Sequence, residues 1–282
     1  MCNDIDSRPK IQYTNAYHEI TDQVQSACGT PGTLSTPSGY WSFVVETKIS
    51  EIADGIYRLA TAVDLPGGMA FSFNQYLVDD EEPLLFHTGP RRLFPRVREG
   101  IEQVLPLARL RYVALSHFES DECGALNELL AAAPRAQPVC SRVAAMVSID
   151  DYADRPPRAL ADGESLSLGQ HAVQWLDTPH LPHAWECGLM MEASTSTLLC
   201  GDLFTQGGRD HVPLTSADIL EPSEEMRRGL DYFAHAPDTG AMLARLADLE
   251  PRTLACMHGS AFSGDGSALL RALAERVASP VS

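Results

Sequence analysis

Apolar and polar positions alternate with a period of two along the chain from about residue 48, which predicts strands. Residues 55–63, GIYRLATAV, place an apolar side chain at nearly every second position, as a half-buried strand does. Residues 71–90, FSFNQYLVDDEEPLLFHTGP, contain two apolar runs on either side of a charged turn, which predicts a β-hairpin. We therefore expect the first half of the domain to be rich in hairpins.

Helical periodicity then alternates with short buried strands. The pattern predicts helices over residues 91–105, 121–134, 142–149, 223–236, 240–249 and 265–278. Apolar runs predict strands within residues 110–117, 137–141, 164–179, 183–204 and 251–260. Hairpins followed by mixed strand and helix indicate an α/β sandwich, in which sheets are covered by helices.

The chain divides into one large domain, residues 48–282, and an N-terminal extension, residues 1–47. The extension is polar, and Gly29–Trp41 forms a turn-rich connection. Its pattern leaves open whether it packs on the domain or is partly disordered. No flexible linker follows residue 50, so a single domain is expected to carry the function.

Charge and cysteine content narrow the class of protein. The 282 residues carry a formal net charge of −17 and no Lys/Arg cluster, which argues against nucleic acid and anionic membranes as partners. Neither a signal peptide nor an apolar stretch of roughly 20 residues is visible. The seven cysteines are scattered and form no CxxC pair, which fits a reducing compartment. We expect a cytoplasmic protein.

Residues that bind metals recur where the predicted strands end. The candidates are His117, Glu119, Asp121 and Glu122 after one strand, His180 and His183 after the next, then Asp202 and His258. Carboxylates packed this closely repel one another, and burying them is costly unless a cation or a proton neutralises them. A metal site is one interpretation, and a solvated loop with acids at a helix N-terminus is the other.

The order of four motifs decides between these interpretations. HFESDE (residues 117–122), TPHLPHAWECG (178–188), LLCGDLFTQG (198–207) and CMHGS (256–260) resemble the metallo-β-lactamase superfamily over about residues 50–265. Glu119, two positions after the first histidine, is similar to flavodiiron proteins and their oxygen-binding diiron relatives. The resemblance implies an αββα sandwich in which two mixed sheets are covered by helices.

The resemblance also implies a ligand set. His117, Glu119 and His183 would bind one metal, Asp121 and His258 would bind the second, and Asp202 would bridge the two. No catalytic residue beyond these ligands is implied.

Two positions depart from the family pattern. Glu122 stands where the family usually has histidine, and the sequence leaves open whether Glu122 binds the second metal, hydrogen-bonds a water or points away. His87 stands where many relatives have aspartate. We expect His87 and His180 beside the ligands, and not on a metal.

The donor chemistry favours iron. Four carboxylates and three histidines form the candidate set, and four negative charges would neutralise two divalent cations. Hard carboxylate oxygens suit iron and manganese, whereas zinc favours imidazole and thiolate. We expect two iron ions, with zinc or manganese as the alternatives.

The expected function is a non-haem diiron protein that binds O₂ or NO, with reduction of the ligand left open. Full flavodiiron proteins carry a flavodoxin domain, but the sequence up to Ser282 leaves no room for a further domain of ~150 residues. We therefore expect no flavin in this chain and a separate electron-donor protein. Related proteins are often dimers, which makes a homodimer one expectation.

Two other functions are compatible with the pattern. A dinuclear zinc hydrolase would cleave an ester, thioester, lactone or phosphoester with a metal-activated water. A sensor would report the state of a bound gas to a partner protein.

Overall fold

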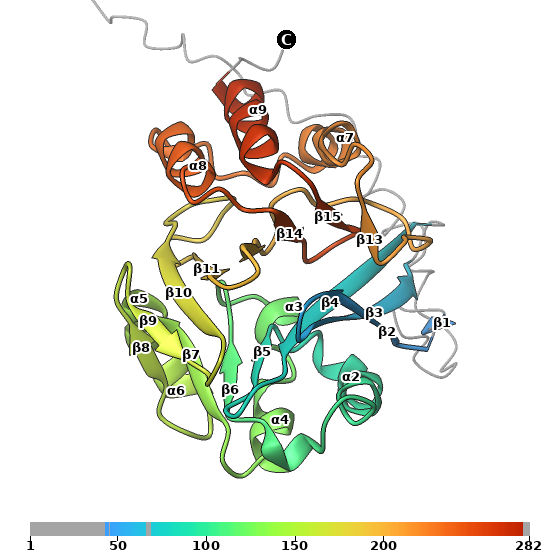
Figure 1. Ribbon diagram of the computed structural model, residues 1–282, viewed down its shortest axis with the longest axis vertical. Helices are drawn as coiled ribbons and strands as arrows, with labels where there is room; N and C mark the ends of the chain where they lie inside the picture. The colour runs from blue at the N-terminus through green and yellow to red at the C-terminus, as the bar shows by residue number, and fades with distance from the viewer. Residues whose placement is uncertain (1–42, 45, 66–68, 279–282) are drawn as a thin grey trace, which may run out of the picture.

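The computed structural model describes residues 43–44, 46–65 and 69–278 (Figure 1). Most of the predicted N-terminal extension thus lies outside the described residues. Its described part includes strand β1 (Phe43–Val44), which pairs antiparallel with β3 (Ile56–Asp64) of the domain.

The first sheet contains β1 to β8, in the order β1-β3-β4-β5-β6-β7-β8, with β2 paired to β3. The remaining strands are β2 (Lys48–Ala53), β4 (Ala70–Val78), β5 (Leu84–Phe86), β6 (Tyr112–Ala114), β7 (Gln137–Ser141) and β8 (Arg158–Leu160). Pairing is antiparallel from β1 to β5 and parallel from β5 to β8. The sheet is therefore mixed, and the predicted hairpin is the β4–β5 pair.

The second sheet has the order β13-β15-β14-β12-β11-β10-β9. Its strands are β9 (Ser165–Ser167), β10 (Ala172–Asp177), β11 (Gly188–Glu192), β12 (Thr197–Leu199), β13 (Leu214–Thr215), β14 (Thr253–Ala255) and β15 (Ala261–Ser263). It is also mixed, because β12–β14 and β13–β15 are parallel pairs.

Helices cover the outer face of each sheet (Figure 1). On the first sheet lie α2 (Phe94–Ile101), α3 (Ser120–Cys123), α4 (Leu126–Ala132), α5 (Arg142–Ala144), a π-helical turn (Ala145–Ile149) and α6 (Asp150–Tyr152). On the second lie α7 (Leu220–Leu230), α8 (Thr239–Ala247) and α9 (Gly266–Ala278). Short 3₁₀ turns span Arg91–Leu93 and Leu107–Arg109.

Three apolar cores separate these layers. One joins the first sheet to α2 and α4, and a second joins the other sheet to α8 and α9. The third lies between the sheets and includes Tyr76, Phe86, Trp175 and Leu199, all almost fully buried. Helix, sheet, sheet and helix therefore follow one another, which confirms the predicted αββα sandwich.

The structure corrects some predicted boundaries. The helix expected over residues 121–134 is two helices, α3 and α4, separated at Gly124 and Ala125. A Cβ on Gly124 would lie 2.9 Å from the backbone nitrogen of Arg91, so the chain passes close to its neighbour there. The helix expected over residues 223–236 ends at Leu230, because Asp231 adopts a left-handed conformation with φ of 49°. Strands β8, β13 and β15 were missed because two or three residues show no periodicity.

Side chains of β4 hold the loop that follows β14 against the first sheet. The Asn74 amide donates to the carbonyls of Cys256 (2.8 Å) and Gly259 (2.9 Å), and the Tyr76 hydroxyl donates to Cys256 (2.7 Å). Arg58 donates to the Gly259 carbonyl as well, at 2.7 Å. Because these groups are buried, the bonds fix the position of this loop between the two sheets.

We predict that Asn74→Ala lowers the free energy of unfolding by about 2 kcal/mol, since two buried hydrogen bonds are lost at about 1 kcal/mol each. Tyr76→Phe removes one bond to the same loop and is expected to cost about half as much. Urea denaturation of both variants measures the difference. An unfolding free energy unchanged by Asn74→Ala would contradict a clamping role.

A buried carboxylate organises the turn between β11 and β12. Glu192 is fully buried and accepts hydrogen bonds from the backbone nitrogens of Ser194 (3.0 Å) and Thr195 (2.8 Å) and from both of their hydroxyls. Burial alone would raise the pKa of Glu192, but these donors lower it to about 2. The folded protein therefore favours the ionised form.

We predict that Glu192→Gln lowers the free energy of unfolding at pH 7 by about 1–3 kcal/mol. The folded-state pKa is depressed, so this stabilisation is present above the ordinary pKa of about 4.3 and is lost as the pH falls toward 2. The difference between variant and wild type should then be smaller at pH 3 than at pH 7. Denaturation at both pH values, with the exposed Glu225→Gln as the control, measures it; a pH-independent difference would contradict the assignment.

Candidate metal centre

The predicted ligands lie where strands of both sheets end. His117 follows β6, and Glu119, Asp121 and Glu122 lie at the start of α3. From the second sheet, His183 lies in the β10–β11 loop, Asp202 follows β12, and His258 follows β14 in the loop held by Asn74. The structure thus brings all seven predicted ligands to one edge of the sandwich.

One group of ligand atoms forms around His117. Its Nε2 lies 3.1 Å from Glu119 Oε2 and 3.0 Å from His183 Nε2. His183 Nε2 lies 3.0 Å from the same Glu119 oxygen and 3.4 Å from Asp202 Oδ2. One atom each from His117, Glu119, His183 and Asp202 all lie within 4.8 Å of one another, a spacing that suits a single metal ion.

A second group forms around His258. Its Nε2 lies 3.3 Å from Asp121 Oδ2 and 3.5 Å from Asp202 Oδ1. Asp202 therefore presents one oxygen to His258 and the other to His183, as a carboxylate shared by two metals would. Oδ1 of Asp202 is buried and has no hydrogen-bond partner within residues 46–65 and 69–278.

Glu122 is the most unusual member of the cluster. It is fully buried, and Oε2 lies 3.8 Å from His117 Nε2. Among the described residues, neither of its carboxylate oxygens has a hydrogen-bond partner. Burial first, and then the charges of Asp121 and Asp202, raise the pKa of Glu122 well above its usual value. The side chain is inside the cluster and does not point away from it.

Hydrogen bonds orient two of the histidines. His258 Nδ1 donates to the Ser72 carbonyl at 2.9 Å, and His117 Nδ1 lies 2.8 Å from Ser116 Oγ. Nε2 of each ring therefore faces the carboxylates, which is the arrangement that a metal-binding histidine needs. Burial opposes protonation of His258, but contacts with Asp121 and Asp202 raise its pKa to about 10. Hydrogen bonds from His117 and His183 lower the pKa of Glu119.

The structure places His87 next to this cluster. Its Nε2 accepts the backbone N–H of Ser116 at 3.3 Å and lies 2.9 Å from Ser116 Oγ, the hydroxyl that contacts His117. Burial lowers the pKa of His87 to about 3, so the ring is neutral. Its proton then resides on Nδ1, 3.1 Å from Met257 Sδ. The Ser116 hydroxyl thus lies within hydrogen-bond distance of both rings and connects His87 to His117.

His180 is placed differently. It is exposed, and among residues 46–65 and 69–278 its side chain has no hydrogen bond or ion pair to the cluster. The structure therefore gives no support to its predicted position beside the ligands.

Sequence patterns missed two contacts of the cluster. The Tyr232 ring lies 5.9 Å from the His183 ring, and its hydroxyl donates to the Asp202 carbonyl at 3.1 Å. Ser116 links His87 to His117. Tyr232 lies 30 residues from Asp202 and carries no local signal, whereas Ser116 adjoins the first motif histidine and could have been proposed from that position.

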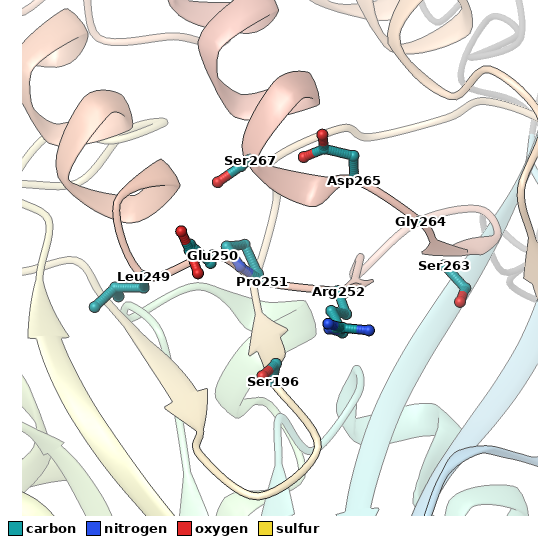
Figure 2. A pocket seen from close by; sticks show the side chains of 9 residues that line it. All are labelled: Ser196, Leu249, Glu250, Pro251, Arg252, Ser263, Gly264, Asp265 and Ser267. Atoms are coloured by element: carbon teal, nitrogen blue, oxygen red, sulfur yellow. The ribbon is translucent and has the colours of Figure 1, made fainter.

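A separate polar pocket of about 740 Å³ lies between α8, α9 and the β11–β12 turn (Figure 2). Arg252, Glu250 and Asp265 are among its lining residues, and none of the seven predicted ligands is. Asp265 accepts the backbone N–H of Ala268 at 2.9 Å and so caps α9. The pocket gathers no set of metal-binding side chains.

Within the described part of the chain, no helix has both the length and the apolar character needed to cross a membrane.

Several characterised proteins are similar in sequence to this region of the chain. Rubredoxin-oxygen oxidoreductase of Megalodesulfovibrio gigas is 28% identical over 205 residues, which cover 70% of this chain and 50% of the relative. Anaerobic nitric oxide reductase flavorubredoxin of Salmonella typhi is 26% identical over 169 residues, which cover 58% of this chain and 34% of the relative. The chain therefore spans half or less of the length of these relatives.

Solved structures confirm the fold. The rubredoxin oxygen:oxidoreductase from Desulfovibrio gigas matches with a TM-score of 0.68 at 24% identity, over 81% of this chain and 62% of that one. A fragment of a putative diflavin flavoprotein from a Nostoc species matches with a TM-score of 0.70 at 20% identity, over 83% and 94%. The sequence model of the ODP family beta lactamase matches residues 71–259 and includes every predicted ligand. Sequence motifs, architecture and family match agree, and the chain belongs to the ODP family of β-lactamase-like proteins.

Proposed function

We propose that this chain holds two iron ions and binds O₂ or NO at the cluster. His117, Glu119 and His183 would hold one iron, and Asp121, Glu122 and His258 would hold the other. Asp202 would be shared by the two. The support is the position of Asp202, whose Oδ2 lies 3.4 Å from His183 Nε2 and whose Oδ1 lies 3.5 Å from His258 Nε2. Ligand atoms of Glu119, Asp121 and Glu122 also lie within 4.8 Å of one another.

The observation that carries the proposal is the state of Glu122. Its carboxylate is fully buried, has no hydrogen-bond partner in the described part of the chain, and lies close to three other carboxylates, which is unfavourable by itself. A divalent cation removes this penalty, because it coordinates the carboxylate oxygens in place of hydrogen-bond donors and its positive charge neutralises theirs. Two such cations balance the four carboxylates of the cluster.

Iron is favoured over zinc by the donor set. Zinc sites prefer histidine and cysteine, and here carboxylates outnumber imidazoles four to three. Two relatives are named for reactions of oxygen and nitric oxide. Bound iron would supply the redox chemistry, while this chain supplies the ligands and the orientation of His117 and His258.

We further propose that a separate protein delivers electrons to the centre. The name of one relative contains rubredoxin, and that of another contains flavorubredoxin. Catalytic turnover depends on this supply, and without it the centre binds gas only. Homodimer formation and a cytoplasmic location stay predictions.

Metal titration tests the role of Glu122. We expect metal-free protein to bind about two Fe(II) ions per chain under anaerobic conditions, and Glu122→Ala to bind about one. Glu99→Ala, which removes an exposed acid on α2, is the matched control and should still bind two. Elemental analysis after desalting measures the stoichiometry. Two tightly bound irons in Glu122→Ala would show that Glu122 is not a ligand.

Exposure to gas tests the identity of the metal and its ligand. We expect O₂ or NO to change the visible absorption of the Fe(II)-loaded protein and to leave the Zn(II)-loaded protein unchanged, because zinc has no redox chemistry. Stopped-flow absorption records the change. Protein that takes up only zinc and hydrolyses model esters would contradict the proposed function.

A further inference from the structure

An apolar cavity opens directly beside the second group of candidate ligands. Its volume is about 490 Å³. Its walls come from the β3–β4 region, with Leu65, Met69, Phe71 and Phe73, and from α7, with Met226 and Leu230. Asp121 and His258 provide the polar part of the lining.

The cavity is far too large for the proposed gas alone. A water molecule, similar in size to a diatomic gas, takes up roughly 30 Å³ in the liquid, so the cavity is larger by about a factor of sixteen. Its volume falls within the range of roughly 300–1,000 Å³ that is typical of pockets for small organic molecules. Such pockets also combine apolar walls with a few polar groups, as this one does.

The lining selects for a neutral, apolar ligand. Met69 and Leu230 are each 44% exposed, and covering these apolar side chains is favourable. The Phe71 ring lies 4.6 Å from the His258 ring, so the apolar wall continues up to the candidate ligand. An organic anion is disfavoured in the metal-free protein because Asp121 lines the cavity and other carboxylates lie close behind it.

We propose that this cavity binds a neutral, mainly apolar organic molecule that lies against Asp121 and His258. The centre thus takes two kinds of ligand, a diatomic gas on the metals and an organic molecule beside them. The inference rests on the proposed function only where it places the molecule next to a metal. The apolar walls exist without the metal, so binding can be tested separately.

The test uses full-length, metal-free protein and the neutral fluorescent probe N-phenyl-1-naphthylamine. We expect a saturable, blue-shifted increase in fluorescence with one site per chain. Met226→Trp fills the cavity and should weaken binding at least about tenfold. Leu230→Trp, at a more exposed position of the same helix, should weaken it too and serves if Met226→Trp fails to fold. Met146→Trp, at a 75% exposed methionine outside the cavity, is the matched control and should bind like wild type.

The proposal would be overturned if the wild type showed no saturable binding or if both cavity variants bound the probe like the wild type. An equal loss of probe binding in the Met146→Trp control would overturn it as well. Probe binding that weakens as the protein dimerises with rising concentration would also overturn it, in favour of a second copy of the chain as the occupant. Iron uptake is measured independently. Probe binding without iron uptake would refute the proposed function and leave the cavity proposal standing. Iron uptake without probe binding would refute the cavity proposal and leave the proposed function standing.

Discussion

The structure depends on how the negative charge of the cluster is neutralised. Ligand atoms of Glu119, Asp121 and Glu122 lie within 4.8 Å of one another. Two like charges about 4 Å apart repel by about 4 kcal/mol at an effective dielectric constant of 20, and three carboxylates form three such pairs. That cost is comparable to the whole stability of a typical domain. Without metal, protons must neutralise the cluster in place of the cations. The pKa values of Glu122 and His258 are raised, so both groups keep a proton to higher pH than usual. Metal binding is therefore coupled to both proton release and folding.

The cluster also depends on the contact between the two sheets, because each sheet supplies only part of it. The first sheet positions His117 and α3, and the second positions His183, Asp202 and His258. Hydrogen bonds cross between the sheets close to these residues, from Asn74 to the carbonyl of Gly259 and from the Gly188 nitrogen to the carbonyl of Ser116. The backbone next to His258 and the backbone next to His117 are thus each held by the opposite sheet, which keeps these two rings in place on either side of the carboxylates.

Some features of the fold and of the candidate site can be predicted from the sequence and others cannot, because only some of them have a local sequence signal. His117, Asp202 and His258 could be proposed as candidates because each lies just after a run of apolar residues, and the end of a buried strand is a local signal. The state of Glu122 was not predictable, because its lack of hydrogen-bond partners depends on side chains from distant segments. The same holds for Tyr232, which reaches His183 and Asp202 only through tertiary packing. His180 shows the converse: it lies in a motif, yet the fold leaves it exposed.

A single chain of contacts connects His87 and Glu122, the two positions that depart from the family pattern. The resemblance places histidine at position 122 and aspartate at position 87 in many relatives, whereas this chain has Glu122 and His87. His87 contacts Ser116, Ser116 contacts His117, and His117 faces Glu122. An aspartate at position 87 would add a fifth negative charge close to four carboxylates, whereas the neutral His87 adds none. The exchange moves one carboxylate from beside the cluster into it and keeps the local charge constant. Two divalent ions would balance that charge in either arrangement. The difference lies in the side chain at position 122, where a carboxylate oxygen stands in place of an imidazole nitrogen. Carboxylate oxygens are harder donors than imidazole, and hard donors suit iron better than zinc.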